Sequence, residues 1–189
     1  MCAAGCQRQQ GTSMLEVLVT VVILAVGLLG LSALQSRLQV AEMESYQRAQ
    51  ALMLLDDMVS RITVNRAQAT QYVTATDEPL GVGHQCRIDA SGPLHERDQC
   101  EWSTLLQGAA ELSGANKVGA MLGGRGCVES LGNQEYLITV AWQAMTPSSA
   151  SLASLSCGQN LYDGGANSTC TNDRCRRAVS TIVRIGTLS

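Results

Sequence analysis

One carboxylate at the start of a long uncharged run is the first feature of this 189-residue chain that points to chemistry. Residues 17–36 carry no charge and are mostly Val, Leu, Ile, Ala and Gly, and Glu16 stands directly before them. About 20 such residues span a ~30 Å hydrocarbon layer as a helix. An ionised carboxylate is costly there, about 3 kcal/mol at the bilayer centre, unless a cation pairs with it. Glu16 is therefore a candidate ion-pairing residue.

The residues that precede Glu16 form a short leader with a glycine at a fixed distance from that carboxylate. A short polar leader ends at Gly11, and Glu16 is the fifth residue after that glycine. This arrangement, Gly-Thr-Ser-Met-Leu-Glu, resembles the class III (prepilin) signal of the type IV pilin family. The resemblance implies that prepilin peptidase cuts between Gly11 and Thr12 and that Thr12 becomes an N-methylated terminus. It also implies that Glu16 pairs with the terminal amine of a neighbouring subunit.

The helical pattern continues beyond the apolar run. From residue 37 onward, apolar residues recur at spacings of three and four, the period of a helix with one buried face. No proline occurs before Pro79, so we expect one helix over residues 13–64. Four segments are predicted: a leader at 1–11, a transmembrane and polymerisation helix at 12–36, an amphipathic second half of the helix at 37–64, and a disulfide-containing globular domain at 65–189.

Eight cysteines divide between the leader and the globular domain. Cys2 and Cys6 lie in the leader, and six lie beyond it: Cys86, Cys100, Cys127, Cys157, Cys170 and Cys175. An even number in a domain behind a membrane anchor indicates a disulfide framework in an oxidising compartment. Six cysteines allow 15 pairings, and the sequence does not choose among them. The best single guess is Cys170 with Cys175. The next is Cys86 with Cys100, which would leave Cys127 with Cys157.

Turn residues and short β-branched runs indicate a small α+β unit in the globular domain. We expect a connecting loop at 63–83, a short extended piece at 84–91 and a helix at 94–112. The glycine-rich segment 123–126 is predicted as a turn before a strand at 127–131, and Gly132-Asn133 as a hairpin turn of type II′. A strand at 136–144, a surface loop at 147–171 and a closing strand at 176–185 follow. The expected fold class is α+β: a pilin-like lollipop in which a long N-terminal helix packs on a small antiparallel sheet of three to four strands.

No residue set in the globular domain has the spacing of a catalytic or metal site. His84, His95, Cys86 and Cys100 are zinc-binding residue types, but their spacing fits no zinc pattern, and an oxidising compartment favours disulfides. Oxygen ligands in segments 163–167 and 172–173 lack the alternation of a calcium loop. Segment 123–126 lacks the Lys-Ser/Thr of a phosphate loop. We therefore expect no enzymatic activity, no metal and no cofactor.

Beyond the signal, several segments resemble the PilV-type minor pilins, also called type IV pilus modification proteins. These segments are residues 45–66, the Glu101-Trp102 helix, the Gly-Arg-Gly-Cys-Val entry to the first strand, and the strand that ends Val-Ala-Trp at 140–142. The resemblance implies a minor pilin, processed by prepilin peptidase, that takes part in pilus assembly by priming it or by joining a tip complex. Its implied partners are other minor and major pilins, prepilin peptidase, the assembly machinery of the inner membrane, and membrane lipid before assembly.

The implied location is the inner membrane, with a cytoplasmic N-terminus, a single pass and a periplasmic C-terminal domain, and then the pilus. The net charge of −3 becomes −4 when Arg8 leaves with the leader, and no Lys/Arg cluster is present, so nucleic acid is not an expected direct partner. Two alternatives remain. A minor pseudopilin of type II secretion shares the signal, the glutamate and the helix, and gene neighbourhood separates it. A bitopic periplasmic binding protein would keep its anchor uncleaved.

Overall fold

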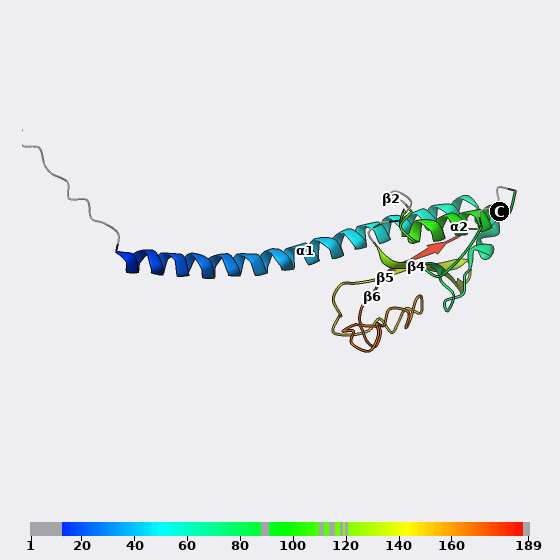
Figure 1. The fold of residues 1–189 in the computed structure, drawn as a ribbon. Coiled ribbons are helices and arrows are strands. Elements are labelled where there is room, and N and C mark those ends of the chain that lie inside the picture. The colour runs from blue at the N-terminus through cyan, green and yellow to red at the C-terminus, as the bar shows by residue number, and fades with distance from the viewer. Residues whose placement is uncertain are drawn as a thin grey trace, which may run out of the picture. The chain divides into compact units, whose positions relative to one another are not determined.

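The structure is a computed structural model that describes residues 13–87, 91–109, 112–113, 116–117, 119 and 121–186. The chain divides into two compact units, Met1–Ala41 and Glu42–Ser189. The predicted leader and Thr12 lie outside the described residues. Along the chain the elements follow in the order α1, η1, β1, α2, β2, β3, β4, β5 and β6 (Figure 1).

A single helix, α1 (Met14–Val64), begins in the first unit and ends in the second. This confirms the long helix predicted over residues 13–64. In the first unit every large apolar side chain from Met14 to Leu38 is exposed. In the second unit one face of the helix is buried, as the change from a uniformly apolar to an amphipathic pattern predicts.

Four antiparallel strands form the main sheet, in the order β1-β4-β5-β6. They are β1 (Leu80–Gly81), β4 (Leu122–Gly132), β5 (Glu135–Gln143) and β6 (Arg176–Arg184). The register between β5 and β6 is unbroken, from Glu135 opposite Arg184 to Gln143 opposite Arg176. With α1 and α2 (Leu94–Leu106), the sheet gives the α+β class predicted from the sequence.

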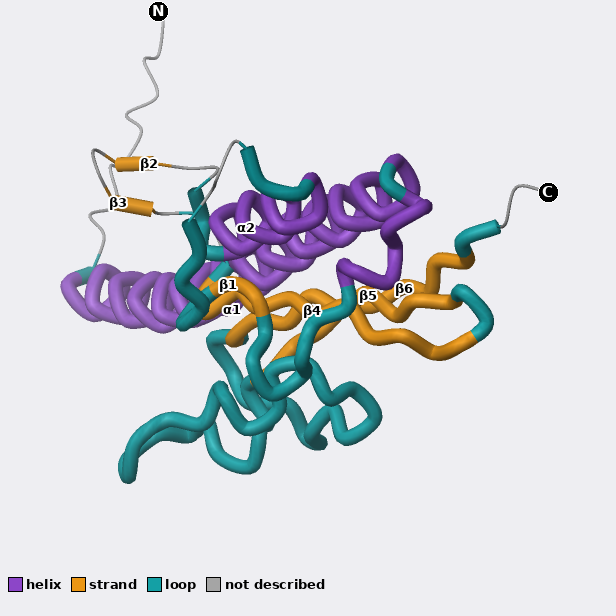
Figure 2. The backbone as a smooth tube through the Cα atoms, turned by 90° about the vertical axis from the view of Figure 1, so that its right-hand side faces the viewer, coloured by secondary structure: helices purple, strands orange, loops and turns teal. Residues whose placement is uncertain are grey.

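The hydrophobic core lies between the helices and one face of the sheet. From α1 it receives the stripe Ala51, Leu55, Met58 and Ile62, each at most 3% exposed. From the sheet it receives Val128 of β4 and the even-numbered residues of β5: Tyr136, Ile138, Val140 and Trp142. Because side chains alternate across a strand, Thr139 and Ala141 point to the opposite face. Figure 2 shows α2 and a long loop on opposite sides of the sheet.

Gly124 and Gly126 lie inside β4, so the turn predicted at 123–126 and the strand start predicted at 127 are wrong. The reason is Trp102 of α2, which is fully buried over Gly126. A Cβ at position 126 would lie 2.1 Å from the indole Cη2. At position 124 a Cβ would lie 2.4 Å from the carbonyl oxygen of Leu106. These glycines mark close helix–sheet packing rather than a change of chain direction.

Several other predicted elements differ from those observed. Helix α2 ends at Leu106 rather than at 112, and Gly108 beyond it has a φ of +86°, which a helix does not accept. A short hairpin of β2 (Leu112–Ser113) and β3 (Asn116–Lys117) follows. The predicted loop at 63–83 contains a 3₁₀ helix, η1 (Arg66–Tyr72), and β1. Residues 84–87 form no strand, and the rest of the predicted extended piece includes residues outside the described ones.

The turn between β4 and β5 is also of a different type from the one predicted. Asn133 and Gln134 are its central residues, because Gly132 pairs with Glu135. Both have positive φ, 49° and 61°. Two positive φ values characterise a type I′ turn rather than a type II′ turn.

The long loop between β5 and β6 covers the second face of the sheet. A disulfide joins Cys157 of the loop to Cys127 of β4, with the Cα atoms 5.8 Å apart. A Cβ at Gly158 would lie 3.6 Å from that of Ala141. The other two disulfides are Cys86–Cys100 and Cys170–Cys175. The three disulfides together are the set of pairs that was ranked first from the sequence.

Candidate functional site

Glu16 lies in the first turn of α1, three residues after the residue that caps the helix. Ser13 is that cap. Its Oγ accepts a hydrogen bond from the N–H of Leu15 at 3.3 Å, and its carbonyl oxygen accepts one from the N–H of Glu16 at 2.9 Å. Ser-x-x-Glu is the spacing of a capping box, and a carboxylate in the first turn lies at the positive end of the helix dipole. The local sequence therefore favours a helix that begins here with Glu16 in its first turn.

The hydroxyl groups of the apolar run behind Glu16 are satisfied within the helix. The hydroxyl of Thr20 donates to the carbonyl oxygen of Val17 at 2.8 Å, and that of Ser32 donates to Leu28 at 2.9 Å. Such bonds remove the need for an outside partner in an apolar medium. Glu16 is the one ionisable side chain among the described residues 13–36.

By length and composition, α1 is the helix in the described part of the chain that is able to cross a membrane. None of its most apolar stretch is buried within the chain, so it does not behave as a core helix. Within a membrane, an ionised carboxylate is costly unless a cation pairs with it. Gly11 and Thr12, the predicted cleavage and methylation residues, lie outside the described residues.

An ion-pair cluster joins the end of α1 to α2. Arg61 donates to Asp57 at 2.8 Å and to Asp98 at 2.9 Å. It also donates to Glu101 at 2.8 Å. Asp98 is buried and accepts a further hydrogen bond from the hydroxyl of Tyr72. Every acid in the cluster is already bonded, so the cluster fixes helices to each other rather than presenting a free acid or base.

Two pKa values in this cluster are shifted. Burial and then the hydrogen bond to Asp98 raise the pKa of Tyr72 to about 12. Burial lowers the pKa of Arg61, but hydrogen bonds to Glu101 and Asp57 raise that pKa by more. Tyr72 is therefore protonated and Arg61 charged at neutral pH.

A buried arginine holds the long loop against the sheet. Arg176 is 1% exposed, and its Nη1 donates to the carbonyl oxygens of Leu155 at 2.8 Å and Cys157 at 3.1 Å. Its Nη2 donates to Leu152 at 2.7 Å, and its Nε pairs with Asp173. Sequence reasoning missed this residue because an Arg-Arg pair at a strand start usually faces solvent. The signal that could have found it is the aspartate three residues earlier, next to a cysteine-rich loop.

The residue sets weighed for metals make other contacts. Cys86 and Cys100 form a disulfide, so neither supplies a thiolate to zinc. The ring of His95 packs edge-on against Tyr72, with centroids 6.2 Å apart. In the candidate calcium loop, Asp163 accepts a hydrogen bond from the N–H of Asp173 at 2.7 Å. Within the part of the chain that the structure describes, no group of three His, Cys, Asp or Glu side chains is placed to hold a metal ion.

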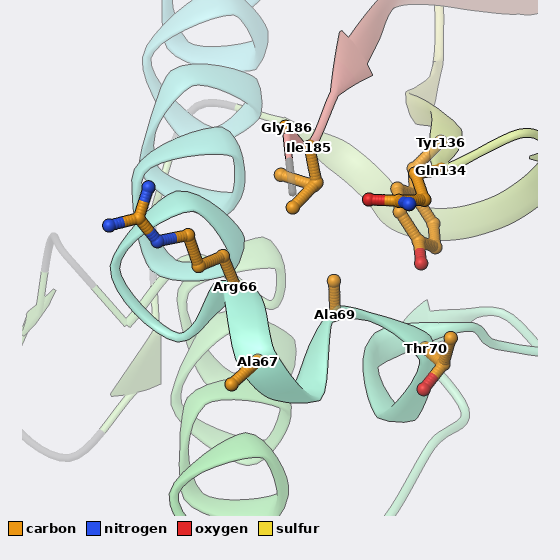
Figure 3. Close-up of a pocket in the computed structure, with 8 residues that line it drawn as sticks. All are labelled: Arg66, Ala67, Ala69, Thr70, Gln134, Tyr136, Ile185 and Gly186. Carbon is orange, nitrogen blue, oxygen red and sulfur yellow. The ribbon is translucent and has the colours of Figure 1, made fainter. Parts of the chain in front are cut away.

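A cleft of about 390 Å³ opens between η1 and the residues that follow β6 (Figure 3). Ala69 and Thr70 line one side, and Tyr136 and Ile185 line the other. Figure 3 shows the guanidinium of Arg66 directed away from Ile185. The lining includes neither a carboxylate nor a histidine, so it offers no acid–base pair for catalysis.

Two comparisons with protein families gave matches. Residues 33–100 match the family described as type IV pilin Tt1218, and residues 6–32 match the prokaryotic N-terminal methylation motif. A search of curated proteins and a search of solved structures found no match. The methylation motif covers Gly11, Thr12 and Glu16. The two matches support the type IV pilin superfamily and a pilin subunit, which is a structural protein. Neither match is to the PilV type.

Proposed function

We propose that this chain is a minor pilin of the PilV type, made as a prepilin and incorporated into a type IV pilus. Its role is in assembly, by priming the fibre or by joining the tip complex. The observation that carries the proposal is an exposed apolar helix with Glu16 in its first turn, within a methylation motif. Before assembly, lipid covers the apolar surface of this helix, and after assembly neighbouring helices cover it. Both environments require an uncharged, apolar surface on all sides of the helix.

Processing is the first step that the proposal requires. Prepilin peptidase cuts after Gly11, and Thr12 becomes the N-methylated terminus. The test is the intact mass of the protein isolated from its native host, which should correspond to a chain that starts at methylated Thr12. Gly11→Ala should block cleavage, whereas Gly5→Ala, a glycine within the leader, should leave it unchanged. A native chain that begins at Met1 contradicts the proposal and favours an uncleaved bitopic protein.

The second step is an ion pair between subunits. The Glu16 carboxylate pairs with the terminal amine of a neighbouring pilin, and the low dielectric of the fibre strengthens this pair. Each charge is uncompensated if its partner is missing. Glu16→Ala should therefore be processed yet enter the pilus poorly. Gln35→Ala removes a polar but uncharged group from the same run and serves as the matched control. Normal incorporation of Glu16→Ala would contradict the pairing.

The cysteines support the compartment that we propose for the second unit. Three disulfides in the second unit support a periplasmic domain, since disulfides persist in oxidising compartments. Together with the candidate span in α1, we infer a cytoplasmic N-terminus. Protease added to spheroplasts should digest the second unit and leave a membrane-bound fragment, and protection of that unit would contradict the orientation.

The minor role and the partners have their own test. Deletion of the gene should reduce the number of pili, and the chain should be a small fraction of sheared fibres, whose bulk is a major pilin. If the chain is the bulk subunit, it is a major pilin. If deletion abolishes protein secretion and leaves piliation unchanged, the chain is a pseudopilin of type II secretion.

A further inference from the structure

The Cys86–Cys100 disulfide has one side open to solvent, and the function proposed above does not use this feature. Cys86 is exposed, whereas Cys100 is only 4% exposed. The four cysteines of the other two bridges are between 0% and 8% exposed. Thiol–disulfide exchange requires a thiolate to reach one sulfur of a bridge. Of the three bridges, Cys86–Cys100 therefore meets this condition best, and it does so at Cys86.

A cleft of about 410 Å³ leads to this bridge. Cys86 and Cys100 both line it. Its charged lining residues have both signs: Arg87 follows Cys86 in the chain, and Glu78 and Glu96 belong to the same lining. A cation near the target favours the approach of a thiolate. The cleft thus offers a thiol a route to the bridge that does not require the domain to unfold.

The bridge is what fastens residues 85–87 to α2. One residue earlier, His84 is held without it, because its N–H donates to the carbonyl oxygen of Gly81 at 3.0 Å and its own carbonyl oxygen accepts from Nε2 of Gln107 at 3.0 Å. Within the part of the chain that the structure describes, residues 85–87 have the disulfide but no hydrogen bond or ion pair. Opening the bridge therefore releases this segment from the helix.

Helix α2 keeps its other attachments when the bridge is open. The indole Nε1 of the fully buried Trp102 donates to the carbonyl oxygen of Leu54 at 2.8 Å. The hydroxyl of Ser103 accepts from the N–H of Gly81 at 2.9 Å. The ion-pair cluster described above also joins α2 to α1. Because none of these contacts involves a cysteine, opening of the bridge should be a local event.

We propose that Cys86 is a thiol-exchange site, at which a dithiol opens the Cys86–Cys100 bridge without unfolding the second unit. One thiolate of the dithiol attacks Sγ of Cys86, so a new S–S bond forms and the bond to Cys100 breaks. Cys100 leaves as a thiolate and takes a proton from solvent. The second thiol of the reagent loses its proton and attacks its partner sulfur in the mixed disulfide, which releases Cys86. The bridge gains two electrons, and the dithiol is oxidised to a disulfide.

Timed reduction of the wild-type full chain in detergent tests the order in which the bridges open. Dithiothreitol is the dithiol, iodoacetamide stops the reaction, and peptide mapping locates the alkylated cysteines. Cys86 and Cys100 should be alkylated at least about tenfold faster than the other four cysteines. The emission maximum of the two tryptophans should stay that of the folded protein. Earlier opening of another bridge, or opening of all three together with a shifted emission maximum, would overturn the proposal.

Two single variants identify the sulfur that is attacked. Cys100→Ala leaves Cys86 as a free thiol, and Cys86→Ala leaves Cys100, so each variant is the matched control of the other and both lack the same bridge. Cys86 should react with a chromogenic aromatic disulfide at least about tenfold faster than Cys100 does. Equal rates, or a faster Cys100, in variants that keep the folded tryptophan emission would refute Cys86 as the exchange site. The inference goes beyond the proposed function, since it requires neither cleavage after Gly11 nor Glu16.

Discussion

The packing of Trp102 on Gly126 gives a prediction that can be worked through quantitatively. Gly126→Ala adds one methyl group to β4 beneath α2. The new Cβ would lie 2.1 Å from Cη2 and 2.4 Å from Cζ3 of the Trp102 indole, and 2.9 Å from a methyl of Leu106. Trp102 is fully buried, and its Nε1 donates to the carbonyl oxygen of Leu54 at 2.8 Å, so the ring is held on both sides. Overpacking of this kind costs about 1–3 kcal/mol.

The cost should appear in the unfolding of the second unit. Each kcal/mol lowers the melting temperature of a domain of this size by about 2–4 °C. Near-ultraviolet circular dichroism and tryptophan fluorescence, recorded on the full chain in detergent, measure it. Gly165→Ala is the matched control, because no atom lies within 4 Å of its added Cβ and its φ is not positive. It should change stability little.

A double-mutant cycle tests the cause. Trp102→Phe removes the two indole atoms that the new methyl group would meet, so Gly126→Ala should cost less in that background than in the wild type. The hydrogen bond to Leu54 is lost in both Phe variants and cancels in the cycle. If Gly126→Ala costs the same in both backgrounds, the indole is not what requires a glycine in β4.

Three further predictions concern the second unit. Arg176→Ala leaves its carbonyl partners and an aspartate buried without the cation, a loss of about 3–5 kcal/mol, and limited proteolysis should cut the loop between β5 and β6 before the sheet. Replacing Cys127 and Cys157 together by serine removes a cross-link of sequence separation 30 and should cost about 3–4 kcal/mol in denaturant titrations. Because the pKa of Tyr72 rises from 10.0 to about 12 on folding, its contribution to stability should be complete below pH 10 and fall as the pH rises to about 12. Tyr72→Phe should lose that dependence.

Local features of the sequence were sufficient for the long helix and its two halves. A helix depends on its own backbone hydrogen bonds, on a cap at its start and on a regular spacing of apolar residues. Ser13 supplies the cap, and no proline interrupts the hydrogen bonds up to residue 64. Glu16 could be identified as a candidate ion-pairing residue from the sequence alone, because it is the one charge next to twenty uncharged residues. Strand β5 was also predicted, because it is rich in β-branched and aromatic residues. Both of its faces are covered, and none of its residues is exposed.

Contacts between distant segments decided the rest. Gly126 belongs to a strand because Trp102, 24 positions earlier, occupies the space of its missing side chain. Arg176 is buried because carbonyl groups 19–24 positions away converge on it, and no local pattern records that convergence. The Cys127–Cys157 bridge likewise required the loop to lie on the sheet. Sequence alone determined what each segment favours by itself; the tertiary structure decided which segments meet, because burial and hydrogen-bond partners are properties of the assembled chain.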